Sequence, residues 1–242
     1  MESFLDRTKD ADLDQLVKEL ASRSHGHTRR SLRLKAWRLT VFGAYATKRI
    51  MDIVISALGM LLLSPLFLLI ALAVKLSSPG PVFFKQVRVG RYGRHFTFYK
   101  FRSMRPNADA EKAGLMARNE SRDGVIFKMK DDPRITKVGR FLRRTSLDEL
   151  PQLWNVFIGD MSLVGPRPPV PSEVEKYTLE DRKRLDVIPG ITCLWQIKGR
   201  SDIPFHEQVR LDKEYILTPG IWKDFVILLK TIPAIIGGKG AY

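Results

Sequence analysis

Cysteine is almost absent from this chain, which has one, Cys193, among its 242 residues. A single cysteine excludes an intramolecular disulfide and a zinc site built from several thiolates, and it is typical of a reducing compartment. Histidine is scarce as well. His25, His27, His95 and His206 show no metal-ligand spacing, so we assign none of them to a metal.

Acidic residues are missing from a long stretch of the chain. Between Thr28 and Arg105 the only one is Asp52, and the whole chain has 26 Asp and Glu against 41 Lys and Arg, a net charge of +15. Such an excess of positive charge predicts an anionic partner. Nucleic acid, anionic lipid headgroups and phosphate-bearing substrates are the candidate classes.

The acid-poor stretch contains an apolar run, Ile50 to Val74, which is interrupted by Ser64-Pro65. A helix of about 25 residues would be roughly 37 Å long, which is enough to cross a bilayer. Basic residues flank both ends, however, and the positive-inside rule keeps such flanks on the cytoplasmic side. The run is therefore either a single signal-anchor helix or a re-entrant helix that turns at its break and leaves by the same face.

The break itself has a chemical cause. Pro65 has no N–H for the Leu61 carbonyl and its ring clashes there, so a helix must kink at this point. The Ser64 hydroxyl can satisfy a freed carbonyl, which allows such a kink to exist in an apolar medium. A buried helix of a soluble protein is disfavoured, because Leu61–Ile70 leaves no polar face apart from the break.

These patterns predict a helix-rich α+β fold in three parts. Residues 1–39 form an N-terminal extension with an amphipathic helix and a basic interfacial segment, 40–77 form the broken membrane helix, and 78–242 form a domain on the cytoplasmic face. Alternation over Val82–Phe101 around a turn at Gly90–Gly93 predicts a small β-hairpin. The following polar segment, Asn107–Val125, predicts a mobile loop or a short helix.

Helix and turn signals dominate from Ile135 onward. The expected elements are a basic helix ending at Arg144, a helix over Asp148–Phe157, a rigid turn at Gly165–Pro169, a helix over Ser172–Leu185, an extended stretch at Ile191–Ile197 and an amphipathic helix over Ile221–Ile236. The last of these suits a membrane interface as well as a protein core.

Two adjacent carboxylates, Asp148 and Glu149, occur where a helix is expected to begin. The simplest interpretation is a capping box with Ser146 as N-cap and Glu149 at the third position. Pro151 fits that register poorly, so a helix that starts at Asp148 is the alternative. In either register an ionised Asp148 could attack phosphorus, and its neighbour could hold Mg²⁺ on a diphosphate.

Several basic residues could bind phosphate groups. Lys100 and Arg102 follow the expected hairpin, Arg143 precedes the carboxylates, Arg167 lies among prolines and Arg200 follows a glycine. For each one alone, a solvated surface position is the simpler interpretation. The prolines around Arg167 favour a side chain that is held in one direction.

Longer motifs connect these residues. They are Asp132–Thr136 (DPRIT), Arg143–Gln152 (RRTSLDELPQ), Asn155, Gly159–Pro168 (GDMSLVGPRP) and Pro189–Thr192 (PGIT). Together with Lys48-Arg49, Asp52, Ser64-Pro65 and Lys100–Arg102 they closely resemble the bacterial sugar transferases, which are monotopic polyprenyl-phosphate phosphoglycosyl transferases. The resemblance covers roughly Lys48 to Tyr242. It implies a membrane-associated monotopic domain whose broken helix is re-entrant.

The resemblance also implies a reaction. Members transfer a sugar 1-phosphate from a UDP-sugar to a polyprenyl phosphate, typically undecaprenyl phosphate, and release UMP with the help of Mg²⁺. This is the initiating step of exopolysaccharide, O-antigen or glycoconjugate synthesis at the cytoplasmic face of the bacterial inner membrane. The expected partners are therefore the UDP-sugar, the polyprenyl phosphate and inner-membrane lipids, with no nucleic acid; homodimerisation is left open.

Carried to this chain, the resemblance makes Asp148 the nucleophile that becomes a covalent phosphosugar enzyme, and Glu149 the Mg²⁺ ligand. It assigns phosphate contacts and the nucleotide to the basic residues Lys100, Arg102, Arg143, Arg167 and Arg200. Cys193 departs from the family, which usually has glycine there, and this questions the backbone geometry near the nucleotide pocket.

Two other functions stay open at this point. A membrane-tethered scaffold or nucleic-acid-binding protein would use the basic surface without turnover. A phosphohydrolase would resolve an aspartyl-phosphate with water in place of a lipid phosphate.

Overall fold

The computed structural model describes residues 42–121, 125–127, 129 and 131–237. The predicted N-terminal amphipathic helix and basic interfacial segment lie outside these ranges. Residues Lys48–Tyr242 belong to one compact unit, which contains all the predicted site residues.

A sharp bend at the serine-proline pair divides the apolar run into two helices. The first covers Phe42–Leu62 and the second, α2, covers Ser64–Ser77, with a bend of 62° between them. The Ser64 hydroxyl donates to the Leu61 carbonyl at 2.8 Å, so serine satisfies the carbonyl that Pro65 cannot reach. The predicted break and its compensation are both confirmed.

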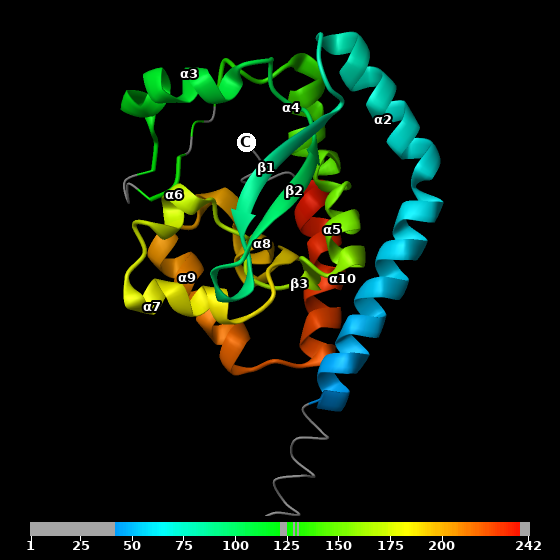
Figure 1. Ribbon diagram of the computed structural model, residues 1–242, viewed down its shortest axis with the longest axis vertical. Helices are drawn as coiled ribbons and strands as arrows, with labels where there is room; N and C mark the ends of the chain where they lie inside the picture. The colour runs from blue at the N-terminus through cyan, green and yellow to red at the C-terminus, as the bar shows by residue number, and fades with distance from the viewer. Residues whose placement is uncertain (1–41, 122–124, 128, 130, 238–242) are drawn as a thin grey trace, which may run out of the picture. The chain divides into compact units, whose positions relative to one another are not determined.

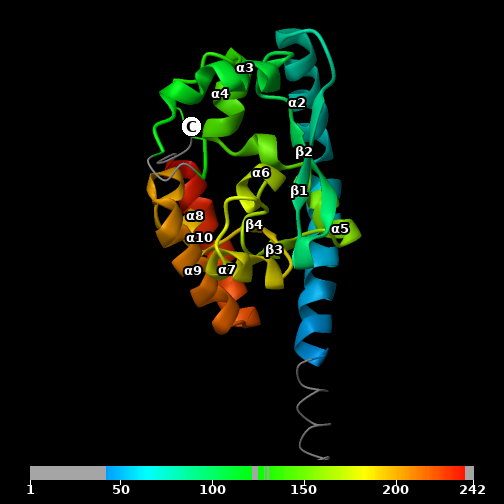
Figure 2. The same ribbon diagram turned by 60° about the vertical axis from the view of Figure 1, so that its left-hand side comes forward.

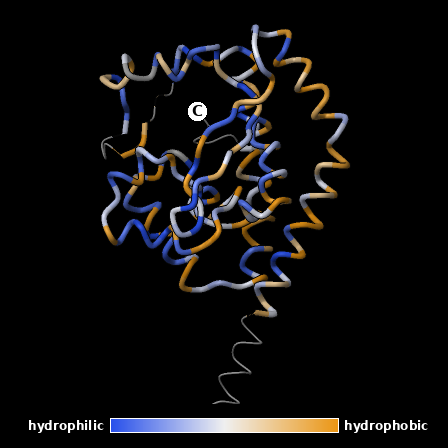
Figure 3. The backbone as a smooth tube through the Cα atoms, viewed as in Figure 1, coloured by the Kyte–Doolittle hydropathy of each residue, from blue (hydrophilic) through white to orange (hydrophobic). Residues whose placement is uncertain are grey.

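This helix pair is mostly hydrophobic along its length, as the largely orange tube in Figure 3 shows. Large side chains that are exposed along it include Leu58, Leu61, Leu62, Leu68, Leu69, Leu72 and Leu76. Among the described residues, no single helix has the length and hydropathy to cross a bilayer, whereas this bent pair meets both criteria jointly.

Two small sheets accompany the helices. Strands β1 (Phe83–Val89) and β2 (His95–Phe101) form the predicted antiparallel hairpin, with Phe83 opposite Phe101. A short 3₁₀ turn, η1 (Arg91–Gly93), connects them. Strands β3 (Ser162–Val164) and β4 (Gly190–Thr192) pair in parallel.

The other elements are short helices and turns. In chain order they are α3 (Ala108–Leu115), η2 (Met116–Arg118), α4 (Lys137–Arg144), η3 (Leu147–Glu149), α5 (Gln152–Ile158), α6 (Pro171–Val174), α7 (Leu179–Arg182), η4 (Lys183–Asp186), α8 (Leu194–Lys198), η5 (Arg200–Asp202), α9 (Phe205–Leu217) and α10 (Ile221–Gly237). The helix-rich α+β prediction is confirmed at this level.

Two expected elements have different bounds. The helix predicted over Ser172–Leu185 is three short pieces, because Thr178 starts a new helix by accepting a hydrogen bond from the Asp181 N–H at 3.2 Å. The extended stretch predicted at Ile191–Ile197 is a strand only as far as Thr192, and α8 follows it.

The main core joins the hairpin, α5, β3 and the helices α8 to α10. Its buried members are Phe98, Val156, Met161, Leu163, Val164, Cys193, Leu194, Trp195, Leu211, Tyr215 and Ile227. Figures 1 and 2 show α10 behind the hairpin and close to α8. A second cluster, made of Ile70, Val74, Phe101 and Leu142, attaches α2 to β2 and α4.

Candidate active site

The two carboxylates lie on a tight turn before α5. Ser146 opens the turn in the left-handed region at φ 55°, and Leu147–Glu149 form η3. The Leu150 N–H donates to the Leu147 carbonyl at 3.3 Å. Both predicted helix starts are therefore wrong: the Pro151 ring would clash with the Leu147 carbonyl in an α-helix, and the chain forms a 3₁₀ turn instead.

Lys100 on β2 holds the two carboxylates together. Its Nζ lies 2.7 Å from Glu149 Oε1 and 3.6 Å from Asp148 Oδ2. The next residue, Phe101, is buried in the cluster that joins β2 to α2, so the base of the lysine side chain is fixed. The structure thus brings together three of the residues predicted from the sequence.

The Asp148 side chain is almost fully buried, with 5% of the residue exposed. Burial raises the pKa of Asp148 above its ordinary value, and the charges of Lys100 and Arg143 oppose this rise while Glu149 adds to it. A carboxylate in this setting is poorly solvated and makes few competing contacts with water. It is suited to act as a nucleophile once it is ionised.

Glu149 differs from its neighbour. Burial disfavours its charged form too, but the ion pair with Lys100, aided by the charges of Arg167 and Arg200, holds the pKa of Glu149 below its usual range. Glu149 is therefore a stable anion. Its oxygens are hard ligands of the kind that Mg²⁺ uses with substrate phosphates.

Arg167 is presented by the Gly165–Pro169 turn, which two backbone contacts hold in place. The buried Arg88 donates from Nη1 to the Pro168 carbonyl at 2.8 Å, and the Val89 N–H donates to the Pro169 carbonyl at 2.9 Å. Burial, with the charge of Arg167 as a second cause, lowers the pKa of Arg88 to about 9. Arg88 therefore contributes a second positive group behind the turn.

Close packing of the β4 backbone also supports the Gly165–Pro169 turn. A Cβ atom at Gly190 would lie 2.0 Å from the Gly165 nitrogen, so only glycine allows β4 to approach the start of the turn. The PGIT motif, which contains Gly190, thus helps to fix the turn that carries Arg167.

Asn155 connects the carboxylate turn to the lysine strand. It is fully buried, accepts a hydrogen bond from the Tyr99 N–H at 3.2 Å and donates to the Thr97 carbonyl at 2.7 Å. These two hydrogen bonds pair backbone groups on the edge of β2 and hold α5 against that strand. In the sequence analysis Asn155 is part of the family motifs but has no assigned role. A polar residue on a largely apolar helix was the signal that could have indicated a buried hydrogen-bonding position.

Of the two remaining predicted residues, Arg102 lies away from the carboxylates and Arg200 lies beside them. Arg102 is buried at the C-terminal end of α2, where its Nη2 donates to the Ser78 carbonyl at 2.7 Å. Its assignment to phosphate binding stays a prediction. Arg200 donates from Nη2 to the Ser146 hydroxyl, and it lines a cavity beside Glu149.

The DPRIT motif supports the site from a distance. Arg134 forms a buried ion pair with Asp132 and donates to the Ala108 carbonyl at 2.9 Å. Thr136 caps the start of α4 by accepting the Gly139 N–H at 2.9 Å. These contacts fix the helix that carries Arg143.

Cys193 is compatible with the local backbone. Its φ of −154° and ψ of 175° are extended values that any residue can adopt, and its side chain is buried in the main core. The structure therefore removes the question that cysteine in place of glycine raised. Its thiol donates to Gln196 Oε1 at 3.2 Å.

Metal binding in this part of the molecule would depend on few protein ligands. In the described ranges no three His, Cys, Asp or Glu side chains gather into a metal-binding group. Magnesium usually takes one or two carboxylates and completes its shell with water and substrate phosphates. Glu149, half-buried next to Asp148, fits that requirement.

Comparison with known proteins agrees with this geometry. The chain matches the family described as bacterial sugar transferase over residues 43–238. It is 48% identical to the galactosyl transferase CpsE of Streptococcus agalactiae over 80% of this chain and 43% of that protein. Identity is 44% with the undecaprenyl-phosphate galactose phosphotransferase of Salmonella typhimurium, over 81% of this chain and 41% of that protein.

A shorter relative matches over most of its own length. The exopolysaccharide production protein ExoY of Sinorhizobium fredii is 43% identical, over 81% of this chain and 88% of ExoY. The chain therefore spans about two fifths of the length of CpsE and of the Salmonella phosphotransferase, but nearly all of ExoY is represented in the match.

Proposed function

Because the chain belongs to the bacterial sugar transferase family, we propose that it transfers a sugar 1-phosphate from a UDP-sugar to polyprenyl phosphate and releases UMP. Undecaprenyl phosphate is the expected acceptor, and the reaction would initiate exopolysaccharide, O-antigen or glycoconjugate synthesis. The observation that carries this proposal is the arrangement of Asp148 and Glu149 around Lys100 Nζ on one tight turn.

The reaction proceeds in two displacements at one phosphorus atom. The Asp148 carboxylate attacks the phosphorus that bears the sugar, an O–P bond forms, and the bond to the bridging oxygen breaks so that UMP leaves with that electron pair. A phosphate oxygen of the lipid then attacks the same phosphorus. The bond to Asp148 breaks, which regenerates the carboxylate and yields a polyprenyl diphosphate sugar.

Basic side chains stabilise the charge that develops on the phosphate groups. Lys100 lies between the carboxylates, Arg143 acts on Asp148 and Arg167 acts on Glu149. We assign Mg²⁺ to Glu149, where a bound ion would neutralise part of the diphosphate charge. Glu149 holds its anionic form for this purpose, while Lys100 keeps it aligned.

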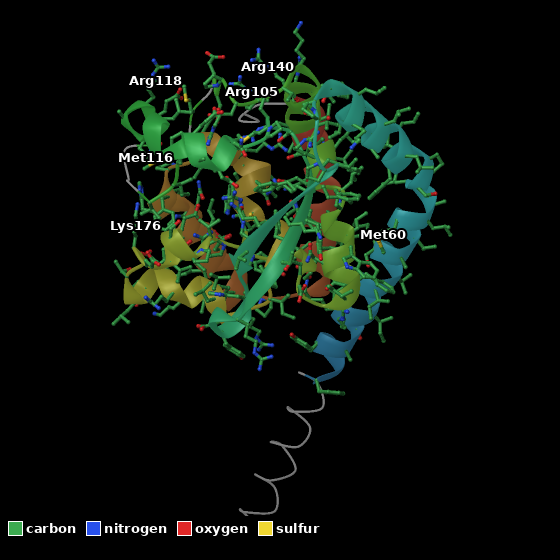
Figure 4. All side chains as sticks on the ribbon, turned by 45° about the horizontal axis from the view of Figure 1, so that its top comes forward. Met60, Arg105, Met116, Arg118, Arg140 and Lys176 are labelled. Atoms are coloured by element: carbon green, nitrogen blue, oxygen red, sulfur yellow. The ribbon has the colours of Figure 1, made fainter. Side chains whose placement is uncertain are left out.

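The membrane arrangement is part of the same proposal. The bent helix pair has apolar residues on its outer surface, and α10 exposes a row of large apolar side chains made of Trp222, Phe225, Leu229 and Ile232. We propose that the pair is re-entrant and that α10 lies at the interface of the cytoplasmic face of the inner membrane. Figure 4 places Arg105, Arg118 and Arg140 at the end where α3 and α4 lie, which supports contact with anionic groups there.

The test is UMP release by the full chain in nanodiscs, across a panel of UDP-sugars with Mg²⁺, with and without undecaprenyl phosphate. We expect sustained release with one or a few donors, only when lipid is present. Asp148→Asn should abolish it, because an amide cannot form the phosphosugar intermediate. Asp186→Asn, on the separate turn η4, is the matched control and should retain activity.

The other outcomes separate the remaining functions. Release that continues without lipid would indicate a phosphohydrolase, in which water resolves the aspartyl intermediate. Absence of release from every donor, or unchanged release by Asp148→Asn, would contradict the transferase mechanism and favour a basic scaffold.

A further inference from the structure

A cavity of about 130 Å³ lies next to the carboxylate turn. Glu149 and Arg200 line one side of it, and most of the remaining wall is apolar, with contributions from Leu150, Leu153, Ile191, Ala234 and Ile235. The cavity thus joins a charged end at the active site to an apolar end against α10.

The apolar end is next to the helices that we assign to the membrane. Leu153 touches the first helix of the bent pair, since a Cβ atom at Gly59 would lie 3.2 Å from Leu153 Cδ1. Leu150 packs against the cluster that contains Ile70 and Val74 of α2. A molecule that leaves this cavity through its apolar end would therefore meet membrane-embedded surface.

The few hydroxyl groups on the wall are already used. Thr192 and Thr231 share a hydrogen bond of 2.7 Å, and the Thr231 hydroxyl also donates to the Ile227 carbonyl at 2.7 Å. Gln196 Oε1 accepts from the Cys193 thiol. A nucleobase needs unused donors and acceptors, whereas a hydrocarbon chain does not, so these contacts favour a hydrocarbon occupant.

The charged end contains a donor that has no protein partner. Arg200 Nη2 binds the Ser146 hydroxyl, while Nη1 is buried and has no hydrogen-bond partner among the described residues. Both residues have left-handed backbone, at φ 54° for Arg200 and φ 55° for Ser146. Such conformations cost energy in non-glycine residues and are common where a side chain must be held for a ligand.

We propose that this cavity holds the first isoprenoid units of the acceptor lipid, with Arg200 Nη1 on its phosphate. The proposal rests on the transferase function above and adds the acceptor site to it. It moves Arg200 from the nucleotide, where the family resemblance placed it, to the acceptor phosphate. The chemistry at both ends fits one amphiphile: a phosphate near Arg200 and Glu149, the latter on the turn that also carries Asp148, and an apolar chain that extends toward α10.

The test separates the two half-reactions of the full chain in nanodiscs. Ala234→Phe fills the apolar end, and Arg200→Met removes the donor at the other end. In a single turnover without lipid, Ala234→Phe should release UMP in a burst of the same amplitude and rate as wild type. Arg200→Met should slow the burst, because Arg200 also holds Ser146 in the carboxylate turn and favours the anion of Glu149. With undecaprenyl phosphate present, each should raise the KM for the lipid on the order of ten-fold, the size of one lost charge-assisted contact.

Ala110→Phe, the same substitution on the exposed side of α3, is the matched control and should leave both half-reactions unchanged. The smaller Ala234→Leu gives a weaker version of the effect in a variant that is easier to fold. A full burst with an unchanged KM for lipid in Ala234→Phe, or an unchanged KM for lipid in Arg200→Met, would overturn the proposal. A reduced burst in Ala234→Leu, or a raised KM for the donor, would assign the cavity to the nucleotide instead.

Failure of the proposed function has a different signature. Wild-type protein would then give no UMP burst with any UDP-sugar, before any variant is compared. A burst from wild-type protein, together with an Ala234→Phe variant that differs only in the lipid step, would support both the function and the acceptor site.

Discussion

At the residue scale, the decisive question is when Asp148 is ionised. Burial raises its pKa, so the nucleophilic form is lost on acidification at a higher pH than for an exposed aspartate. Lys100, with Nζ 3.6 Å from Asp148 Oδ2, limits that rise. We therefore expect the lysine to set the lower pH limit of activity, in addition to the phosphate contact that we propose for it.

We expect Lys100→Met to move the acid limb of the kcat/KM profile for the UDP-sugar to higher pH. Loss of the positive charge raises the pKa of Asp148 further, so more alkaline conditions are needed to ionise it. The rate on the plateau should also fall, since a contact to phosphate is removed. The measurement is kcat/KM between pH 5 and pH 9, the range in which ordinary aspartate stays ionised.

Lys85→Met is the control for this experiment. Lys85 is exposed on β1, opposite Tyr99 in the same hairpin, so its loss removes a lysine without removing the carboxylate contact. Its pH profile should match that of wild type. An acid limb that does not move in Lys100→Met, or that moves equally in Lys85→Met, would contradict the role of Lys100.

Residue identity alone allowed part of this site to be predicted. Asp148, Glu149 and Lys100 follow from charge and motif, and the structure brings them together. Arg102 shows the limit of that reasoning, because a basic residue next to the lysine of the site can equally cap a helix, as it does on α2. Arg88 was not predicted, since its burial behind the proline turn depends on contacts distant in the chain.

At the scale of elements, the site depends on how α5 lies against β2. Asn155 provides both hydrogen bonds at this junction, to the backbone of Thr97 and Tyr99. The junction sets the separation between Lys100 on the strand and the carboxylates on the turn before the helix. The junction should contribute appreciably to stability, because the Asn155 side chain that makes both hydrogen bonds is fully buried.

Asn155→Leu tests this junction. Leucine is close to asparagine in size but leaves the Tyr99 N–H and the Thr97 carbonyl unsatisfied. We expect the free energy of unfolding to fall by about 1–3 kcal/mol for each group, and the UMP burst to slow even in the fraction that stays folded. Chemical denaturation and single-turnover kinetics measure the two effects.

The comparison variant is Ile158→Leu, on the exposed side of the same helix, which should change neither quantity. Wild-type stability in Asn155→Leu would show that water replaces the asparagine. Lost stability with a normal burst rate would show that the junction supports the fold without setting the active-site geometry.

Element boundaries were predictable where one residue determines them. Pro65 breaks the apolar helix, and glycines bound the hairpin turn, so the structure agrees with the sequence in both places. The turn that carries the two carboxylates was mispredicted because its sequence is compatible with a helical capping box and with a 3₁₀ turn. The choice between them depends on Ser146, whose left-handed backbone is held by the side chain of Arg200 from a distant turn.

At the scale of the whole unit, polar contacts hold the bent helix pair against the site. Arg49 donates to the Val156 and Phe157 carbonyls at the end of α5, at 2.6 and 2.8 Å. Asp52 accepts the Leu163 N–H at 3.0 Å, so the same helix is also tied to β3. Under the proposed membrane arrangement, a helix attached in this way would position the carboxylates relative to the bilayer, because α5 follows directly after them.

The same anchoring makes the topology of the pair testable with cysteines. Cys193 gives little background, since it is buried and burial raises its pKa well above the ordinary value, which disfavours the reactive thiolate. Gly43→Cys and Ser77→Cys introduce exposed thiols at the two ends of the pair, and Leu62→Cys introduces one at the bend. An impermeant maleimide then reports which ends share a face.

A re-entrant pair should expose both ends to the cytoplasmic side. We expect the maleimide to label Gly43→Cys and Ser77→Cys in inside-out vesicles and neither of them in spheroplasts, because the basic flanks hold both ends on one side. Leu62→Cys should react from neither side, since it lies in the hydrocarbon region. Labelling of one end from each side would instead require the pair to span the membrane, and the break at Pro65 would then be a kink within a single crossing.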